Sequence, residues 1–159
     1  MRRGFLCLFF CLAIAVTGGC GGSDDSTPKV ADSPAGAAIE GGSDEERKEA
    51  REVQDYFVRN CALPGTIRRV SKRERELPLF PIYKRWLTGE EAMCGHMASI
   101  AVDGTRVTIR SEIAPGTRKA AGEAFCNLIQ GSDVADFTPG HELQDLDGET
   151  IKVCPARND

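Results

Sequence analysis

The stretch MASIAVDGTRVTIRSEI, residues 97–113, decides the fold because it has the pattern of an amphipathic β-hairpin. Apolar residues alternate with smaller or polar ones on both sides of Asp103-Gly104, and this period of two places them on one face of a strand pair. Asp103-Gly104 supplies the two central residues that a type I′ turn needs. The stretch therefore predicts two antiparallel strands with one apolar face and one face open to water.

A helix is expected on each side of this hairpin in the sequence. The first should run from Ser43 to Asn60, since Ser43 followed three residues later by Glu46 is a capping-box signature. Pro64-Gly65 ends it, and Pro115-Gly116-Thr117 opens the second helix, which should reach Gln130. Both carry apolar stripes at helical spacing: Ala50, Val53, Phe57 and Cys61 in the first, and Ala121, Ala124, Phe125 and Leu128 in the second.

A second hairpin is expected near the C-terminus, with Asp147-Gly148 as its turn and Ile151 and Val153 as inward residues of the closing strand. Its pattern resembles that of the first hairpin, which is compatible with two helix-plus-hairpin units or simply with two Asp-Gly turns. The order α-β-β-α-β-β predicts an α+β domain, in which a small antiparallel sheet of two hairpins has two helices on one face.

The N-terminus has the pattern of an export signal. Two arginines precede an apolar run over residues 5–16, which is too short to cross a bilayer core of about 30 Å as a permanent helix. The run ends in Thr17-Gly18-Gly19-Cys20, and this ending resembles the lipobox of bacterial lipoproteins. The resemblance implies that residues 1–19 are a signal peptide, that Cys20 carries a lipid on its thiol, and that the protein is anchored on the extracytoplasmic face of the cell membrane.

An ordinary secretory signal is the alternative. The lipoprotein family usually carries Leu where Thr17 stands, and cleavage after Ala13-Ile14-Ala15 would release a soluble protein. Such cleavage would leave Cys20 as an odd, exposed thiol, which favours the lipoprotein. The Gly-Gly-Ser-Asp-Asp that follows Cys20 and the excess of 14 Arg over 6 Lys resemble the uncharacterised lipoproteins of high-GC Gram-positive bacteria.

Composition limits the exported part of the chain. Removing Arg2 and Arg3 changes the formal net charge from -4 to -6, so nucleic acid is not expected as a partner. Residues 20–42 are mostly small or polar, and we expect a lipid-anchored, disordered linker there, because such a segment buries too little apolar area to offset the entropy of ordering it. Residues 43–159 then form one disulfide-stabilised domain.

Four cysteines remain in that domain, namely Cys61, Cys94, Cys126 and Cys154. An even set in an exported chain predicts two disulfides, for which three pairings are possible. Pairing Cys61 with Cys94 would clamp the intervening segment at its ends, and pairing Cys126 with Cys154 would join the second helix to the last strand. This pairing is slightly favoured, although strict alternation would turn Cys154 away from the face of Ile151 and Val153.

A basic segment lies between the first two of these cysteines. Its positive residues are Arg68, Arg69, Lys72, Arg73 and Arg75, and the apolar and aromatic stretch of residues 77–87 follows. Such a combination suits contact with anionic lipid headgroups or a partner. It equally suits a solvated loop whose apolar end packs against the domain, and this second interpretation is favoured because Pro78 and Pro81 argue against a continuous amphipathic helix.

Signals for catalysis are weak. The two histidines, His96 and His141, lack the paired spacing of zinc ligands, and no phosphate loop, G-x-S-x-G elbow or H-E-x-x-H motif occurs. Four scattered carboxylates do not define an acid/base pair: Glu90, Glu91, Asp133 and Asp136. We therefore expect no metal or cofactor and favour a binding or interaction module of the cell envelope, acting on an envelope protein or a small ligand. The alternatives are an accessory structural protein and a small secreted hydrolase with an unrecognised site.

Overall fold

The computed structural model describes residues 29–62, 64–104, 106–132 and 140–155. The strands are β1 (Ala38–Glu40), β2 (Met97–Asp103), β3 (Arg106–Ser111), β4 (His141–Gln144) and β5 (Thr150–Cys154). The helices are α1 (Asp44–Asn60), α2 (Thr66–Arg69), α3 (Lys72–Arg75), α4 (Phe80–Cys94) and α5 (Arg118–Gln130), with short 3-10 helices η1 (Pro34–Gly36) and η2 (Pro115–Thr117). The predicted signal peptide, Cys20, Asp133 and Asp136 lie outside the described residues.

The five strands form one sheet in the order β1-β2-β3-β4-β5. The two expected hairpins, β2-β3 and β4-β5, are antiparallel, whereas β1 runs parallel to β2 and β3 runs parallel to β4. The α+β class is confirmed, but the prediction of a purely antiparallel sheet is wrong. The reason is that α5 carries the chain from β3 back to the start of β4, and such a crossover leaves the two strands parallel.

Strand β1 arises from a segment that was expected to be disordered. The prediction of a linker over residues 20–42 is therefore wrong for η1 and β1, which belong to the fold. Backbone pairing with β2 places Ile39 beside Ile100 of the core, and the side-chain amide of Gln54 on α1 donates to the carbonyls of Pro34 and Ala37 at 3.0 and 2.9 Å. Backbone hydrogen bonding to an existing sheet thus provides the stabilisation that the few apolar residues of this segment could not provide by burial alone.

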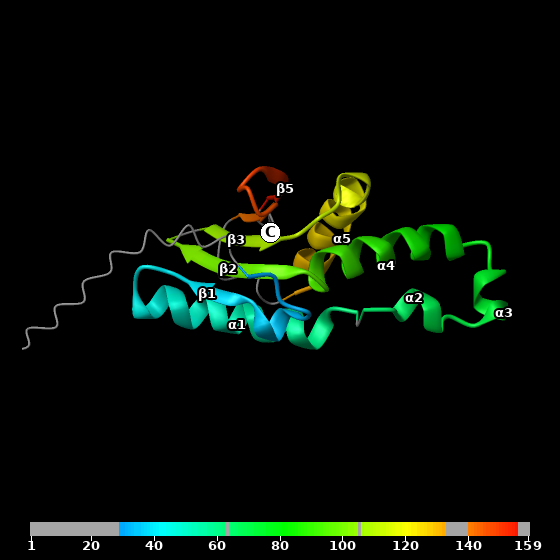
Figure 1. The fold of residues 1–159 in the computed structure, drawn as a ribbon, viewed down its shortest axis with the longest axis horizontal. Coiled ribbons are helices and arrows are strands. Elements are labelled where there is room, and N and C mark those ends of the chain that lie inside the picture. Colours follow the sequence, from blue (N-terminus) through cyan, green and yellow to red (C-terminus); the bar gives the residue numbers. More distant parts are fainter. Residues whose placement is uncertain (1–28, 63, 105, 133–139, 156–159) are drawn as a thin grey trace, which may run out of the picture.

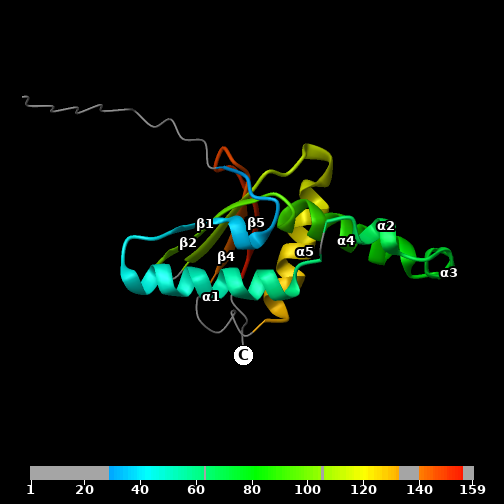
Figure 2. The same cartoon turned by 60° about the horizontal axis from the view of Figure 1, so that its bottom comes forward.

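Helices α1 and α5 cover one face of the sheet, as expected (Figure 2). The capping box of α1 is present: Glu46 N donates to Ser43 Oγ at 3.1 Å, and Ser43 N donates to the Glu46 carboxylate at 2.7 Å. Phe57 of α1 stacks on Phe125 of α5 with ring centroids 6.5 Å apart. The core thus joins both helices through residues that the periodicity had placed on their inner faces.

The turn of the first hairpin lies one residue later than expected. Asp103 pairs with Arg106 across the ladder, so Asp103 belongs to the strand and the loop begins at Gly104. Gly104 has a φ of +55°, in the left-handed region that glycine adopts without strain. The apolar face is unaffected by this shift, since Ile100 and Ile109 are paired and fully buried.

The prediction that Ile151 and Val153 point inward is wrong for Val153, whereas Ile151 is partly buried and packs against the core. Val153 is 51% exposed, whereas Cys154 is buried. The register explains this: Leu143, which is buried on the helix-covered face, pairs with Lys152, and residues paired across a ladder share a face. Cys154 consequently points toward α5, where a disulfide to that helix can form.

Candidate functional site: a disulfide-closed arm

Both favoured disulfides are present. Cys126 of α5 is bonded to Cys154 of β5 with a Cα–Cα distance of 5.4 Å, and Cys61 is bonded to Cys94 with a Cα–Cα distance of 5.9 Å. The second bond joins the residue that ends α1 to the last residue of α4, which lie 33 positions apart. It closes a loop around the basic segment, as the sequence predicted.

Most of this closed loop projects from the body of the protein, and we call residues 64–87 the arm. The arm contains α2, α3 and the first half of α4, and Figures 1 and 2 both show it extending past the end of the sheet, with α3 at its far end. Pro78 and Pro81 were expected to argue against a continuous amphipathic helix, and the segment is indeed divided into three helices, although residues 80–87 are helical. Pro78 precedes α4, and Pro81 lies in its first turn, where a backbone N–H would have no partner within the helix.

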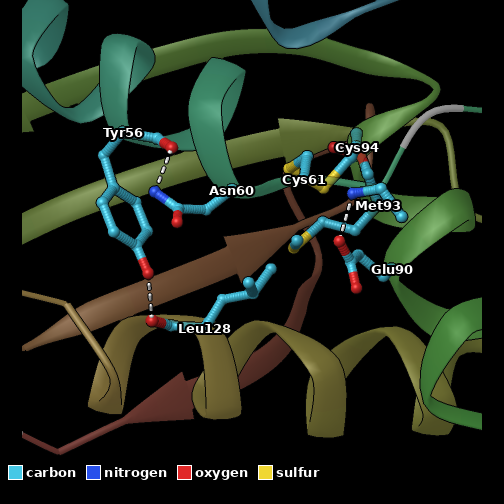
Figure 3. The surroundings of a disulfide bond; sticks show 9 residues. Tyr56, Asn60, Cys61, Glu90, Met93, Cys94 and Leu128 are labelled. Atoms are coloured by element: carbon cyan, nitrogen blue, oxygen red, sulfur yellow. Dashed lines mark hydrogen bonds between the residues drawn. A yellow bond between two sulfur atoms is a disulfide. The ribbon is translucent and has the colours of Figure 1, made fainter. Parts of the chain in front are cut away.

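The base of the arm, where the chain leaves and re-enters the body at the Cys61–Cys94 disulfide, is held by carboxyl groups of α4 (Figure 3). Glu90 is 1% exposed and accepts a hydrogen bond from Ala62 N, and Glu91 accepts one from Ile67 N at 3.2 Å. Burial raises the pKa of Glu90 above its usual range, and the neighbouring charge of Glu91 adds to this. The two carboxyls bind the backbone that enters the arm, so they have a structural role.

Two further contacts hold together the helices from which the arm projects. The hydroxyl of Tyr56 on α1 donates to the carbonyl of Leu128 on α5 at 2.7 Å (Figure 3). Gly89 of α4 lies so close to α5 that a Cβ atom there would be 2.1 Å from the carbonyl oxygen of Ala120. The second half of α4 is thereby packed against the body, which leaves its first half to project.

An apolar groove of about 600 Å³ lies along the arm. It is lined by Glu74, Leu77, Leu79, Phe80, Ile82, Tyr83, Trp86 and Asn127. Leu77, Leu79 and Ile82 are 55%, 71% and 70% exposed, and the Tyr83 ring stacks beside Trp86 at 6.0 Å. The favoured expectation that the apolar end of the segment packs against the domain is therefore wrong for these residues.

Charge is distributed unevenly between the arm and the body. The arm has seven basic and two acidic residues, a formal charge of +5, so the rest of the chain from Cys20 onward carries -11. The five basic residues predicted as a contact site are all exposed on or next to α2 and α3: Arg68, Arg69, Lys72, Arg73 and Arg75. In the described part of the chain none of them forms an ion pair.

The open face of the sheet, by contrast, is internally paired. The Glu142 carboxylate accepts hydrogen bonds from Gln144 Nε2 at 3.0 Å, from the Thr150 hydroxyl and from Arg106 Nη1 at 3.1 Å. These bonds, the one from Gln144 foremost, hold the pKa of Glu142 below its usual range. Arg110 in turn donates to Gln144 Oε1 at 3.2 Å. A face whose polar groups bind one another in this way is a weaker candidate for a ligand than the arm.

The histidines do not form a site in the structure. His96 is exposed, whereas His141 is 1% exposed and pairs with Cys154 across the β4-β5 ladder. Burial lowers the pKa of His141, and neither ring nitrogen has a hydrogen-bond partner among the described residues. Within those same residues no group of three or more His, Cys, Asp or Glu side chains is arranged to hold a metal ion.

The sequence interpretation recognised the basic residues of the arm and the apolar stretch that follows them, but it expected that stretch to pack against the domain and did not name its residues as a site. Leu79, Ile82, Tyr83 and Trp86 are spaced at i, i+3, i+4 and i+7, which is the signal of one helical face. The prediction gave more weight to Pro78 and Pro81 than to this spacing.

None of the helices in the described ranges is long and apolar enough to span a bilayer. Comparison with protein-family models, with curated proteins and with solved structures finds no match to this chain.

Proposed function

We propose that the protein is a lipoprotein of the cell envelope, anchored through Cys20 on the extracytoplasmic side of the membrane, and that it acts as a small binding module. The observation that carries the binding role is the exposed groove of the arm. Soluble monomeric proteins seldom leave a contiguous group of large apolar side chains in water unless the group binds something. The two disulfides support an oxidising compartment outside the cytoplasm.

The anchor is tested by replacing Cys20 with Ser. Two or three acyl chains hold a protein stably, at about 0.8 kcal/mol per buried CH₂, so the wild type should partition into the detergent phase of a membrane extract. The Cys20→Ser variant should appear in the medium or as an uncleaved precursor. Cys11→Ser is the matched control, because it changes a thiol within the signal peptide and should not alter partitioning. Wild-type protein free in the medium with Val16 at its N-terminus would refute the anchor.

The binding role is tested by a photo-reactive amino acid placed at Ile82 in the groove, with irradiation of intact cells. Val58 on α1 is the matched control position, since it is also a large apolar residue, 47% exposed, but lies outside the arm. We expect a covalent adduct from position 82 and none from position 58. Equal labelling from both positions, or none from either, would contradict a binding site on the arm.

A further inference from the structure

We infer that the arm binds the anionic surface of the bilayer itself, inserting its exposed apolar side chains beside the headgroups. This inference rests on the proposed function, because it names what the binding module contacts. Its basis is the combination of exposed apolar side chains, aromatic rings and unpaired positive charge on one projecting element.

Charge complementarity is the first argument. The arm carries +5 on an otherwise acidic chain, so a negative surface attracts the arm and repels the remainder. Each Lys or Arg near an anionic bilayer strengthens association about five-fold. The electric field of an anionic bilayer would therefore orient the protein so that the arm points toward the membrane.

The arrangement of the apolar residues is the second argument. Leu79 and Ile82 are largely exposed, at 71% and 70%, and no described segment covers them. Tyr83 and Trp86 lie next to them in the groove, and such amphipathic rings favour the headgroup level of a bilayer. Basic, aromatic and aliphatic groups thus occur together, as they do in segments that lie in a membrane interface.

A bilayer suits this surface better than a folded protein partner does. Five positive charges within eight residues, spread over two short helices, match a diffuse negative surface. A protein interface would instead have a core depleted of charge. The anchor also keeps the folded domain close to the bilayer, because the nine residue steps from Cys20 to Lys29 span at most about 30 Å even when fully extended.

The test uses the lipidated protein reconstituted into vesicles, so that the anchor holds it on every membrane. Trp86 is the only tryptophan and lies in the groove, so its fluorescence reports on the arm. In vesicles that contain phosphatidylglycerol we expect its emission to shift to shorter wavelength and to be quenched by brominated acyl chains. Neither change is expected in pure phosphatidylcholine vesicles. Raising the salt from 0.15 to 1 M should reverse both changes, because it shortens the Debye length from about 8 to about 3 Å.

Two variants separate the contributions of charge and apolar contact. Replacing the five basic residues by Gln should abolish the fluorescence changes, whereas the matched control, Arg51 and Arg59 of α1 replaced by Gln, should retain them. Ile82→Ser alters one exposed side chain, so it should fold normally and should weaken quenching. Circular dichroism checks the fold of each variant.

The outcomes separate this inference from the proposed function. Quenching that is equal in neutral and anionic vesicles, or that persists in the Gln variant, would overturn the inference. Absence of quenching together with a protein adduct from the Ile82 probe would also overturn it, while the binding module would stand. Failure of Cys20 to direct membrane partitioning would refute the anchor alone.

Discussion

Substituting Gly89 by Ala tests the contact that holds the arm to the body. The new Cβ would lie 2.1 Å from the carbonyl oxygen of Ala120 and 2.4 Å from its carbonyl carbon, where ordinary contact begins at 3.4 Å. The atom met is backbone of α5, which has no side-chain rotation to escape by. Helices α4 and α5 must therefore separate by more than about 1 Å to admit one methyl group, a disturbance of the kind that overpacking produces.

The expected magnitude follows from two opposing terms. Overpacking costs about 1–3 kcal/mol, and this severe clash belongs at the upper end of that range. Ala is favoured over Gly in a helix interior by about 1 kcal/mol. We therefore expect the free energy of unfolding to fall by about 2 kcal/mol.

Urea denaturation, followed by circular dichroism and by the fluorescence of Trp86, measures this loss. The matched control is Gly116→Ala, since a Cβ at Gly116 would have no heavy atom within 4 Å, and its effect should stay within about 0.5 kcal/mol. A Gly89→Ala protein as stable as the wild type would show that the two helices do not approach as closely as described.

Three further changes test the fold. Replacing Cys61 and Cys94 together by Ser opens a loop closed over 33 residues and should cost about 4 kcal/mol in the chain-entropy model, measured by urea denaturation. Burial depresses the pKa of His141, so the stability that its neutral ring contributes is complete above a pH of about 6.5 and is lost as the pH falls. The urea midpoints at pH 7 and pH 5 should therefore differ less in His141→Leu than in the wild type, and equal differences would contradict this. Tyr56→Phe loses a 2.7 Å hydrogen bond and should cost about 1 kcal/mol, whereas Tyr83→Phe at the exposed groove should be neutral in the same assay.

Local patterns predicted local structure well. The capping box of Ser43 and Glu46 and the alternation that buries Ile100 and Ile109 depend on residues a few positions apart, so they are visible in the sequence. The parallel pairing of β3 with β4 depends on the path of α5 across the sheet. No short-range pattern encodes that path, and the same holds for β1, whose three residues pair with a strand about 60 positions later.

The candidate site was predicted only in part, because its charge is visible in the sequence whereas the exposure of its apolar residues depends on packing. The charge of each residue is known from the sequence, so the sequence identifies Arg68 and its basic neighbours as a candidate contact site. Exposure of Leu79 and Ile82 depends on how far α4 extends past α5, and that distance is set by packing at Gly89. Pro81 interrupts a continuous helix but lies in the first turn of α4, where proline favours helix initiation.

Closure of the arm by the Cys61–Cys94 disulfide also bears on how the protein would withstand proteolysis. The arm exposes arginines and lysines on short helices, and such surfaces are where nicking concentrates. A single cut between the two cysteines would leave both fragments covalently joined, with the core contacts of α1 and of the second half of α4 intact. The nicked protein would therefore migrate as one chain without reductant and as two with it, and an anchored molecule would keep its folded domain at the membrane after the damage.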